Sequence, residues 1–216
     1  MALKAVIFDM DGVLVDSEGF WAKAELDVFS SYGVQITEDL AAQTKYMTTT
    51  EVTEFWYGKF PWENLDIPSV EQEVVTRVIG LIQSEECTMS GVQDFIRHLK
   101  NKEYKIGLAT NAPLRVAEAV LKKLQVRDLF DTVNSSESEI HGKPHPAVYL
   151  ASAKELGIGP EHCIAIEDSH SGLRAAKEAG MKTAVFTNNN ENIDFEIADF
   201  KIRNFKDALL PVFSGE

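Results

Sequence analysis

Short apolar runs alternate with amphipathic segments over most of the chain. The run at 3–8 has consecutive apolar residues, which is typical of a strand buried on both faces of a parallel sheet. Similar runs lie at 104–110, 163–168 and 182–187. Apolar residues recur at helical spacing between them, at 90–102, 113–126, 146–157 and 171–180. This alternation predicts an α/β fold, a three-layer domain with a Rossmann-like parallel sheet.

Residues 17–88 interrupt this alternation. Helical patterns follow one another there without a strand between them, at 17–33, 37–46, 49–60 and 69–86. We therefore expect a sheet core made of residues 1–16 and 89–216, with an all-helical domain inserted at 17–88. Asp16 is expected to cap the first helix of the insert.

The charge and the cysteines narrow the class of protein. The chain of 216 residues has a formal net charge of −13, which disfavours non-specific binding to nucleic acid or to an anionic membrane. No apolar run approaches the length of a membrane span, and no secretory pattern precedes the first strand. Cys87 and Cys163 lie far apart without metal-binding spacing, so we expect a reducing, cytoplasmic setting. A monomer is the default expectation.

Polar residues follow the predicted strands at the ends where they would meet. Asp9 and Asp11 follow the first strand, Thr110 and Asn111 end the second, and Glu167 and Asp168 end the 163–168 strand. Ligands of parallel sheets bind outside the carboxyl ends of the strands, so these side chains are expected in one crevice. Lys143, in the preceding loop "HGKPHP", is expected to join them.

The acids of such a crevice must either take up protons or hold a cation. At about 4 Å and an effective dielectric near 20, each pair of like charges costs roughly 4 kcal/mol. Oxygen ligands of this kind favour Mg²⁺, which takes one or two carboxylates together with substrate phosphate. Thr110, Asn111 and Lys143 add donors for an anion. Metal ligands beside anion-binding donors indicate phosphoryl transfer.

Four motifs in this order resemble those of the haloacid dehalogenase superfamily. They are "DMDGVLVD" at 9–16, "LATN" at 108–111, Lys143 in "GKPHP", and "IEDSHSG" at 166–172. The helical insert resembles the cap of the β-phosphoglucomutase-like group. The resemblance implies the strand order 5-4-1-2-3 and a cap that opens and closes over the site.

The resemblance also implies roles for the crevice residues. Asp9 would be the nucleophile that forms an aspartyl-phosphate, and Asp11 the general acid and base. Lys143 and Thr110 would hold the phosphoryl oxygens. Mg²⁺ would bind Asp9, the backbone carbonyl of Asp11 and Asp168, with Glu167 as a direct or an outer ligand.

The insert indicates the substrate. β-Phosphoglucomutases carry an arginine in the cap loop and a histidine after the first motif, where this chain has Thr49 and Trp21. A mutase must hold a second phosphate, so we expect hydrolysis of a small sugar monophosphate instead. The stretch "TEFWYGKFPW" also resembles bacterial 2-deoxyglucose-6-phosphate and hexitol phosphatases. Trp21, Lys45 and Asn111 are the expected substrate contacts. A β-phosphoglucomutase and a binding module without catalysis are the alternatives.

Overall fold

A parallel sheet forms the centre of the larger of two bodies. The computed structural model describes residues 2–44, 47–193 and 195–206. Within them the sheet has six parallel strands in the order β3-β2-β1-β4-β5-β6. The strands are β1 (Ala5–Phe8), β2 (Lys105–Thr110), β3 (Thr132–Ser135), β4 (Cys163–Glu167), β5 (Lys182–Phe186) and β6 (Phe200–Ile202). The expected order of five strands is confirmed, and β6 extends it at one edge.

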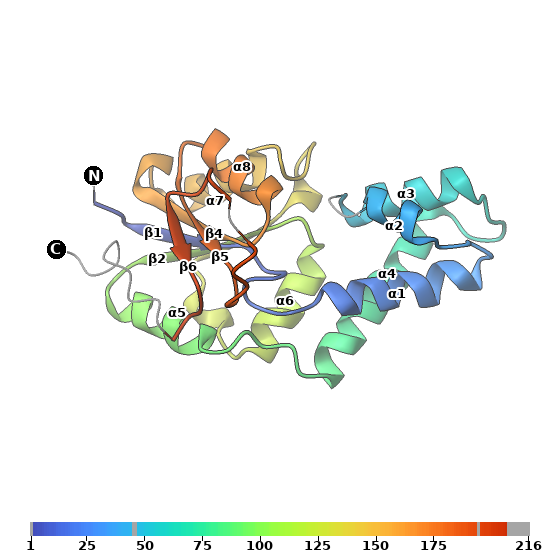
Figure 1. The fold of residues 1–216 in the computed structure, drawn as a ribbon, viewed down its shortest axis with the longest axis horizontal. Coiled ribbons are helices and arrows are strands. Elements are labelled where there is room, and N and C mark those ends of the chain that lie inside the picture. The colour runs from blue at the N-terminus through green and yellow to red at the C-terminus, as the bar shows by residue number, and fades with distance from the viewer. Residues whose placement is uncertain (1, 45–46, 194, 207–216) are drawn as a thin grey trace.

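Helices cover both faces of the sheet (Figure 1). They are α5 (Val92–Asn101), α6 (Leu114–Lys123), α7 (Ala147–Leu156) and α8 (His170–Glu178). Strand β1 alternates between the two sides: Val6 and Phe8 pack with α5 and α6, whereas Ala5 and Ile7 pack with α7 and α8. Burial on both faces explains the continuous apolar run that predicts this strand.

The hydropathy pattern does not predict two of the strands. Strand β3 has the sequence Thr-Val-Asn-Ser, and edge strand β6 has only three residues. Neither carries a run of apolar residues, because the middle two residues of β3 are only partly buried and only the last residue of β6 is buried. Their backbone pairing with β2 and β5, rather than local hydrophobicity, places them in the sheet.

A second body, which we call the cap, stands at one side of the sheet (Figure 1), and its described residues form four helices. They are α1 (Glu18–Ser31), α2 (Glu38–Thr44), α3 (Thr49–Lys59) and α4 (Ile67–Ser84). Rings of Phe29, Trp56 and Trp62 fill its interior, with centroids 6.2 Å apart for each pair that includes Phe29. None of the described helices is both long and apolar enough to cross a membrane.

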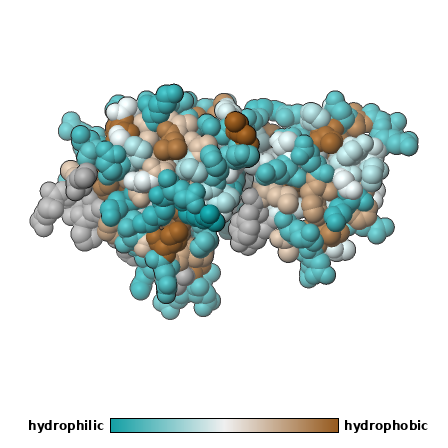
Figure 2. Space-filling view, turned by 90° about the horizontal axis from the view of Figure 1, so that it is seen from above, coloured by the Kyte–Doolittle hydropathy of each residue, from teal (hydrophilic) through white to brown (hydrophobic). Residues whose placement is uncertain are grey.

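Two chain segments join the cap to the rest of the protein, and they pair with each other. The Asp16 N–H donates to the Cys87 carbonyl at 2.8 Å, and the Met89 N–H donates to the Leu14 carbonyl at 3.0 Å. Helix α4 also packs against α6. Seen from above, core and cap form two lobes with mostly hydrophilic surfaces (Figure 2). The paired crossing is therefore the natural place for a hinge between them.

Phe8 anchors the strand that carries the first acidic motif. Its ring is fully buried and packs edge-on against Phe95 and Phe130, with centroids 6.2 and 6.1 Å away. We predict that Phe8→Ala lowers the free energy of unfolding by about 3–5 kcal/mol, measured by urea denaturation. Leu114→Ala is the control, because Leu114 is 41% exposed and its loss should change stability by less than about 0.5 kcal/mol. Equal losses in the two variants would contradict this assignment of the core.

Candidate active site

Three neighbouring strands bring the acidic motifs together. Asp9 directly follows β1, Glu167 ends β4, and Thr110 ends β2, while β1 lies between the other two strands. The Asp9 N–H extends the ladder by donating to the Ile166 carbonyl at 2.9 Å. The crevice expected at the carboxyl ends of the strands is therefore present. Lys143 enters it from the loop before α7.

The Lys143 ammonium is the electrostatic centre of this crevice. Its Nζ donates to Asp9 Oδ1 at 2.7 Å, to Glu167 Oε1 at 2.6 Å and to the Ala109 carbonyl at 2.8 Å. These three bonds account for its three protons. Burial alone would lower the pKa of Lys143, but the carboxylates of Asp9 and Glu167 raise it above its ordinary value. The lysine therefore stays charged and holds the two acids together.

Glu167 is fully buried and both of its oxygens are engaged. Oε1 also accepts the Tyr149 hydroxyl at 2.6 Å, and Oε2 accepts the Ser169 hydroxyl at 3.1 Å. Burial and the adjacent carboxylate raise the pKa of Tyr149, which therefore keeps its proton and donates. A Cβ at Gly172 would lie 1.9 Å from Oε1, so only glycine leaves room for this carboxylate. Glu167 is thus built to position its neighbours.

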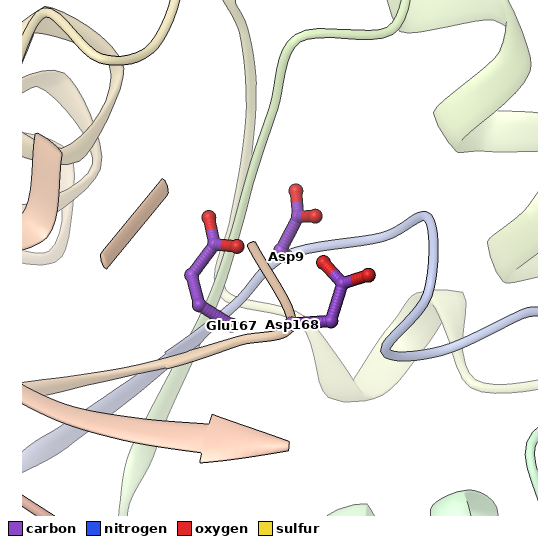
Figure 3. A group of neighbouring side chains, drawn as sticks. All are labelled: Asp9, Glu167 and Asp168. Atoms are coloured by element: carbon purple, nitrogen blue, oxygen red, sulfur yellow. The ribbon is translucent and has the colours of Figure 1, made fainter. Parts of the chain in front are cut away.

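Asp9, Glu167 and Asp168 form a group that can hold a cation (Figure 3). One ligand atom from each lies within 4.8 Å of the others. Burial, followed by the charge of Glu167, raises the pKa of Asp168 to about 7 and raises that of Asp9 well above its usual range. Crowded carboxylates of this kind fit a hard divalent cation such as Mg²⁺. Glu167 contributes least, because its oxygens already accept hydrogen bonds.

The turn after Asp9 depends on Gly12. Its φ of +74° lies in the left-handed region, and a Cβ there would come within 2.0 Å of Asp168 Oδ2. The glycine therefore allows both the sharp turn and the close approach of Asp168. This is the physical reason for a glycine directly after the two acids of the first motif.

Asp11 is positioned by the beginning of the cap. Ser17 Oγ and Trp21 Nε1 both donate to Asp11 Oδ1, the indole from 3.0 Å. Burial raises the pKa of Asp11, although these two bonds oppose the shift. The expected cap by Asp16 is wrong: Asp16 is exposed, and Ser17 occupies the N-cap position of α1. Ser17 gives its hydroxyl to Asp11 and not to the helix backbone.

Asn111 and Thr110 organise the loops around the crevice. The Asn111 side chain accepts the Lys143 N–H at 2.8 Å and donates to the Lys143 carbonyl at 3.4 Å, so it clamps the loop that delivers the lysine. Thr110 is buried, and its Oγ1 accepts the Ala112 N–H at 3.0 Å. The structure therefore gives Asn111 a positioning contact where a substrate contact was expected.

The remaining expectations concern the cap. Lys45 lies outside the described residues. Trp21 reaches the crevice, but its described hydrogen bond goes to Asp11. A cavity of about 460 Å³ opens beside Lys143, lined by Met47 and Glu51 of the cap and by the loop 141–145. Cap and core therefore share a space beside the loop that carries Lys143.

Sequence reasoning missed Ser17, Tyr149 and Ser169. The role of Tyr149 could have been predicted, because it falls on the inward face of a predicted helix and a buried phenol requires a hydrogen-bond partner. The contacts of Ser17 and Ser169 with the acids could not have been predicted, because a serine next to a helix start is ordinarily a cap. Ser169 does cap α8, accepting the Gly172 N–H at 3.0 Å, while also donating to Glu167.

Comparisons with known proteins agree with the motifs. The sequence model of the haloacid dehalogenase-like hydrolases matches residues 3–180. The chain is 38% identical over 201 residues to hexitol phosphatase B of Escherichia coli, covering 92% of this chain and 90% of that protein. It is 30% identical over 190 residues to the beta-phosphoglucomutase of Bacillus subtilis, covering 83% and 81%. The crystal structure of CbbY from Rhodobacter sphaeroides with phosphate superposes with a TM-score of 0.83 at 26% identity, covering 95% and 96%.

Two glycines in helices test the packing around Glu167. We predict that Gly172→Ala destabilises the protein, because its Cβ would collide with the Glu167 carboxylate. Gly80→Ala makes the same chemical change in α4, where nothing lies within 4 Å of the added carbon. It should stabilise the protein by about 0.5–1 kcal/mol through helix propensity. Urea denaturation of both variants should show shifts of opposite sign. Stabilisation by both would show that Glu167 is not packed as described.

Proposed function

The chain belongs to the haloacid dehalogenase-like hydrolases and is a phosphoric monoester hydrolase, and we propose that it hydrolyses small hexose or hexitol monophosphates with Mg²⁺. The observation that carries the proposal is the pairing of Asp9 with Lys143 at 2.7 Å, beside an Asp11 carboxyl that the cap holds in place. It provides a nucleophile and an acid two residues apart on a rigid strand end.

Asp9 would act as the nucleophile. Lys143 holds its Oδ1, and a carboxylate oxygen of Asp9 attacks the phosphorus of the substrate. The P–O bond to the sugar breaks as the new P–O bond to Asp9 forms, which gives an aspartyl-phosphate. Water then attacks the same phosphorus, releases inorganic phosphate and restores the carboxylate.

Asp11 would move the proton in both halves of the reaction. Burial raises its pKa, which favours the protonated carboxyl that a general acid needs. Ser17 and Trp21 occupy Oδ1, so Oδ2 is the oxygen suited to carry the proton. It gives that proton to the departing sugar oxygen and takes one from the attacking water.

Other residues would bind the phosphoryl group and the ion. The Thr110 hydroxyl accepts a backbone N–H and keeps its own proton for a phosphoryl oxygen. Asp9, Asp168 and the Asp11 carbonyl would hold Mg²⁺, and Glu167 would orient the cluster through Lys143. A bound Mg²⁺ neutralises part of the charge on the phosphoryl oxygens.

Two observations support a sugar phosphate as the substrate and favour its hydrolysis over a phosphoglucomutase reaction. The relative with 38% identity is named a hexitol phosphatase. Thr49 and Trp21 also stand where the resemblance to β-phosphoglucomutases calls for an arginine and a histidine. The mutase alternative is favoured by the 30% identity to a beta-phosphoglucomutase. Stimulation by added glucose 1,6-bisphosphate would identify a mutase, whereas a phosphatase releases phosphate without it.

Asp9→Asn should abolish turnover while the protein stays folded, because the amide keeps the shape but cannot attack phosphorus. Asp11→Asn should lower kcat by about 10²- to 10⁴-fold, the usual contribution of a general acid. The measurement is phosphate release from a panel of hexose and hexitol phosphates, with circular dichroism to check folding. Asp94→Asn is the matched control, since that side chain is 90% exposed. Wild-type turnover by purified Asp9→Asn would refute the assignment.

Removal of divalent cations with EDTA should abolish phosphate release, and Mg²⁺ should restore it. Ca²⁺ should not, because its larger and looser coordination shell would disturb an in-line attack by Asp9. Mg²⁺ at about 100 times its Kd should also stabilise the fold by about 2.7 kcal/mol, which raises Tm. This rise in Tm should vanish in Asp168→Ala and persist in Asp94→Ala. Full activity in excess EDTA would overturn the metal requirement.

A further inference from the structure

One acid interrupts the inward face of the first cap helix. Helical spacing places Trp21, Ala24, Glu25, Val28 and Phe29 on one stripe of α1. Ala24, Val28 and Phe29 are buried, and Trp21 reaches into the crevice. Glu25 is the single charged residue of this stripe, at a position where packing alone would call for an apolar side chain.

Glu25 also lacks the compensation that buried charges ordinarily have. No hydrogen bond or ion pair to it occurs among the residues that the structure describes. Its side chain is partly buried, and this burial raises its pKa to about 7. Asp27, on the outer side of the same helix, pairs with Arg77 at 2.7 Å and with Lys23 at 3.3 Å. An unpaired, partly buried carboxylate is unfavourable in the free protein, so a binding role accounts for it best.

Glu25 lies one helical turn beyond the residue of α1 that contacts Asp11. The Trp21 indole lies 3.0 Å from Asp11 Oδ1, the oxygen of the proposed general acid. Residues four apart on a helix are neighbours on the same face, and the rise between them is about 6 Å. Glu25 therefore follows Trp21 along α1, one turn farther from Asp11. A leaving group that extends from Asp11 along this helix would come within reach of its carboxyl group.

We propose that Glu25 is a specificity-determining residue that accepts hydrogen bonds from the hydroxyl groups of the sugar leaving group. The inference rests on the proposed function and deepens it. A carboxylate offers about four lone-pair sites, which suit neighbouring hydroxyls of a polyol. In its ionised form, Glu25 would also repel a second phosphate at the far end of the substrate. Glu25 would thus select monophosphates whose leaving group is a neutral polyol, and reject sugar bisphosphates.

The test compares two substrates in the full-length protein with saturating Mg²⁺. Sorbitol 6-phosphate presents hydroxyls to the cap, and p-nitrophenyl phosphate presents none. Glu25→Leu should lower the ratio of their kcat/KM values, sugar over aryl, by about 10- to 100-fold, since hydrogen bonds to a charged group are lost. Glu25→Gln should recover part of the ratio because the amide oxygen still accepts. Glu63→Leu, on the exposed α3–α4 loop, removes the same charge and should leave the ratio at the wild-type value.

Each other outcome points to a different failure. Equal losses on both substrates in a folded Glu25→Leu protein would mean a structural role and overturn the inference, as would an unchanged ratio. Wild-type protein that hydrolyses the aryl phosphate but no sugar phosphate would overturn the proposed substrate class, and the role of Glu25 with it. Wild-type protein inert on both would overturn the proposed function itself. Thermal unfolding of Glu25→Leu should show a Tm equal to or above the wild-type value, because leucine suits the stripe.

Discussion

The buried contact between Lys143 and the carboxylates of Asp9 and Glu167 is the interaction on which the site depends. The ends of β1 and β4 bring four acids to a space where water is largely excluded, and such charges repel strongly at low dielectric. The ammonium at 2.7 and 2.6 Å from two of them offsets that repulsion. Surrounding residues secure it: Asn111 clamps the lysine's backbone from both sides, while Tyr149 and Ser169 fix Glu167.

The acids of the site differ in how far their charge is compensated within the protein. Glu167 accepts hydrogen bonds from Lys143, Tyr149 and Ser169, which fix its orientation beside Asp9. Asp168 and Asp9 retain raised pKa values because their burial is not fully compensated within the protein. A bound divalent cation would compensate the remaining negative charge of these two carboxylates. The site is thus preorganised for charge that develops on a transferring phosphoryl group.

The cap contacts the acidic site through Asp11. Asp11 is held by Ser17 and Trp21, which lie at the start of the first cap helix, and the two segments that cross between the bodies bond to each other. Movement of α1 would therefore shift the partners of Asp11. The position of the cap and the hydrogen bonding of Asp11 are therefore coupled, because Trp21 belongs to the cap and donates to Asp11.

Much of this protein follows from the sequence by itself. The buried run at 3–8, the helical periods and the glycines at 157 and 180 depend on local hydropathy and backbone freedom, so strand β1 and the helices α7 and α8 could be predicted. The motif acids and Lys143 could be placed in one crevice because parallel strands present their carboxyl ends together. Only tertiary structure decided the rest. Strands β3 and β6 exist through pairing with neighbours, and Ser17, Tyr149 and Glu25 gain their significance from residues distant in the chain or from the face of the helix that the fold buries. Hydrogen-bond partners and burial are properties of the packed chain, and no local pattern of residues encodes them.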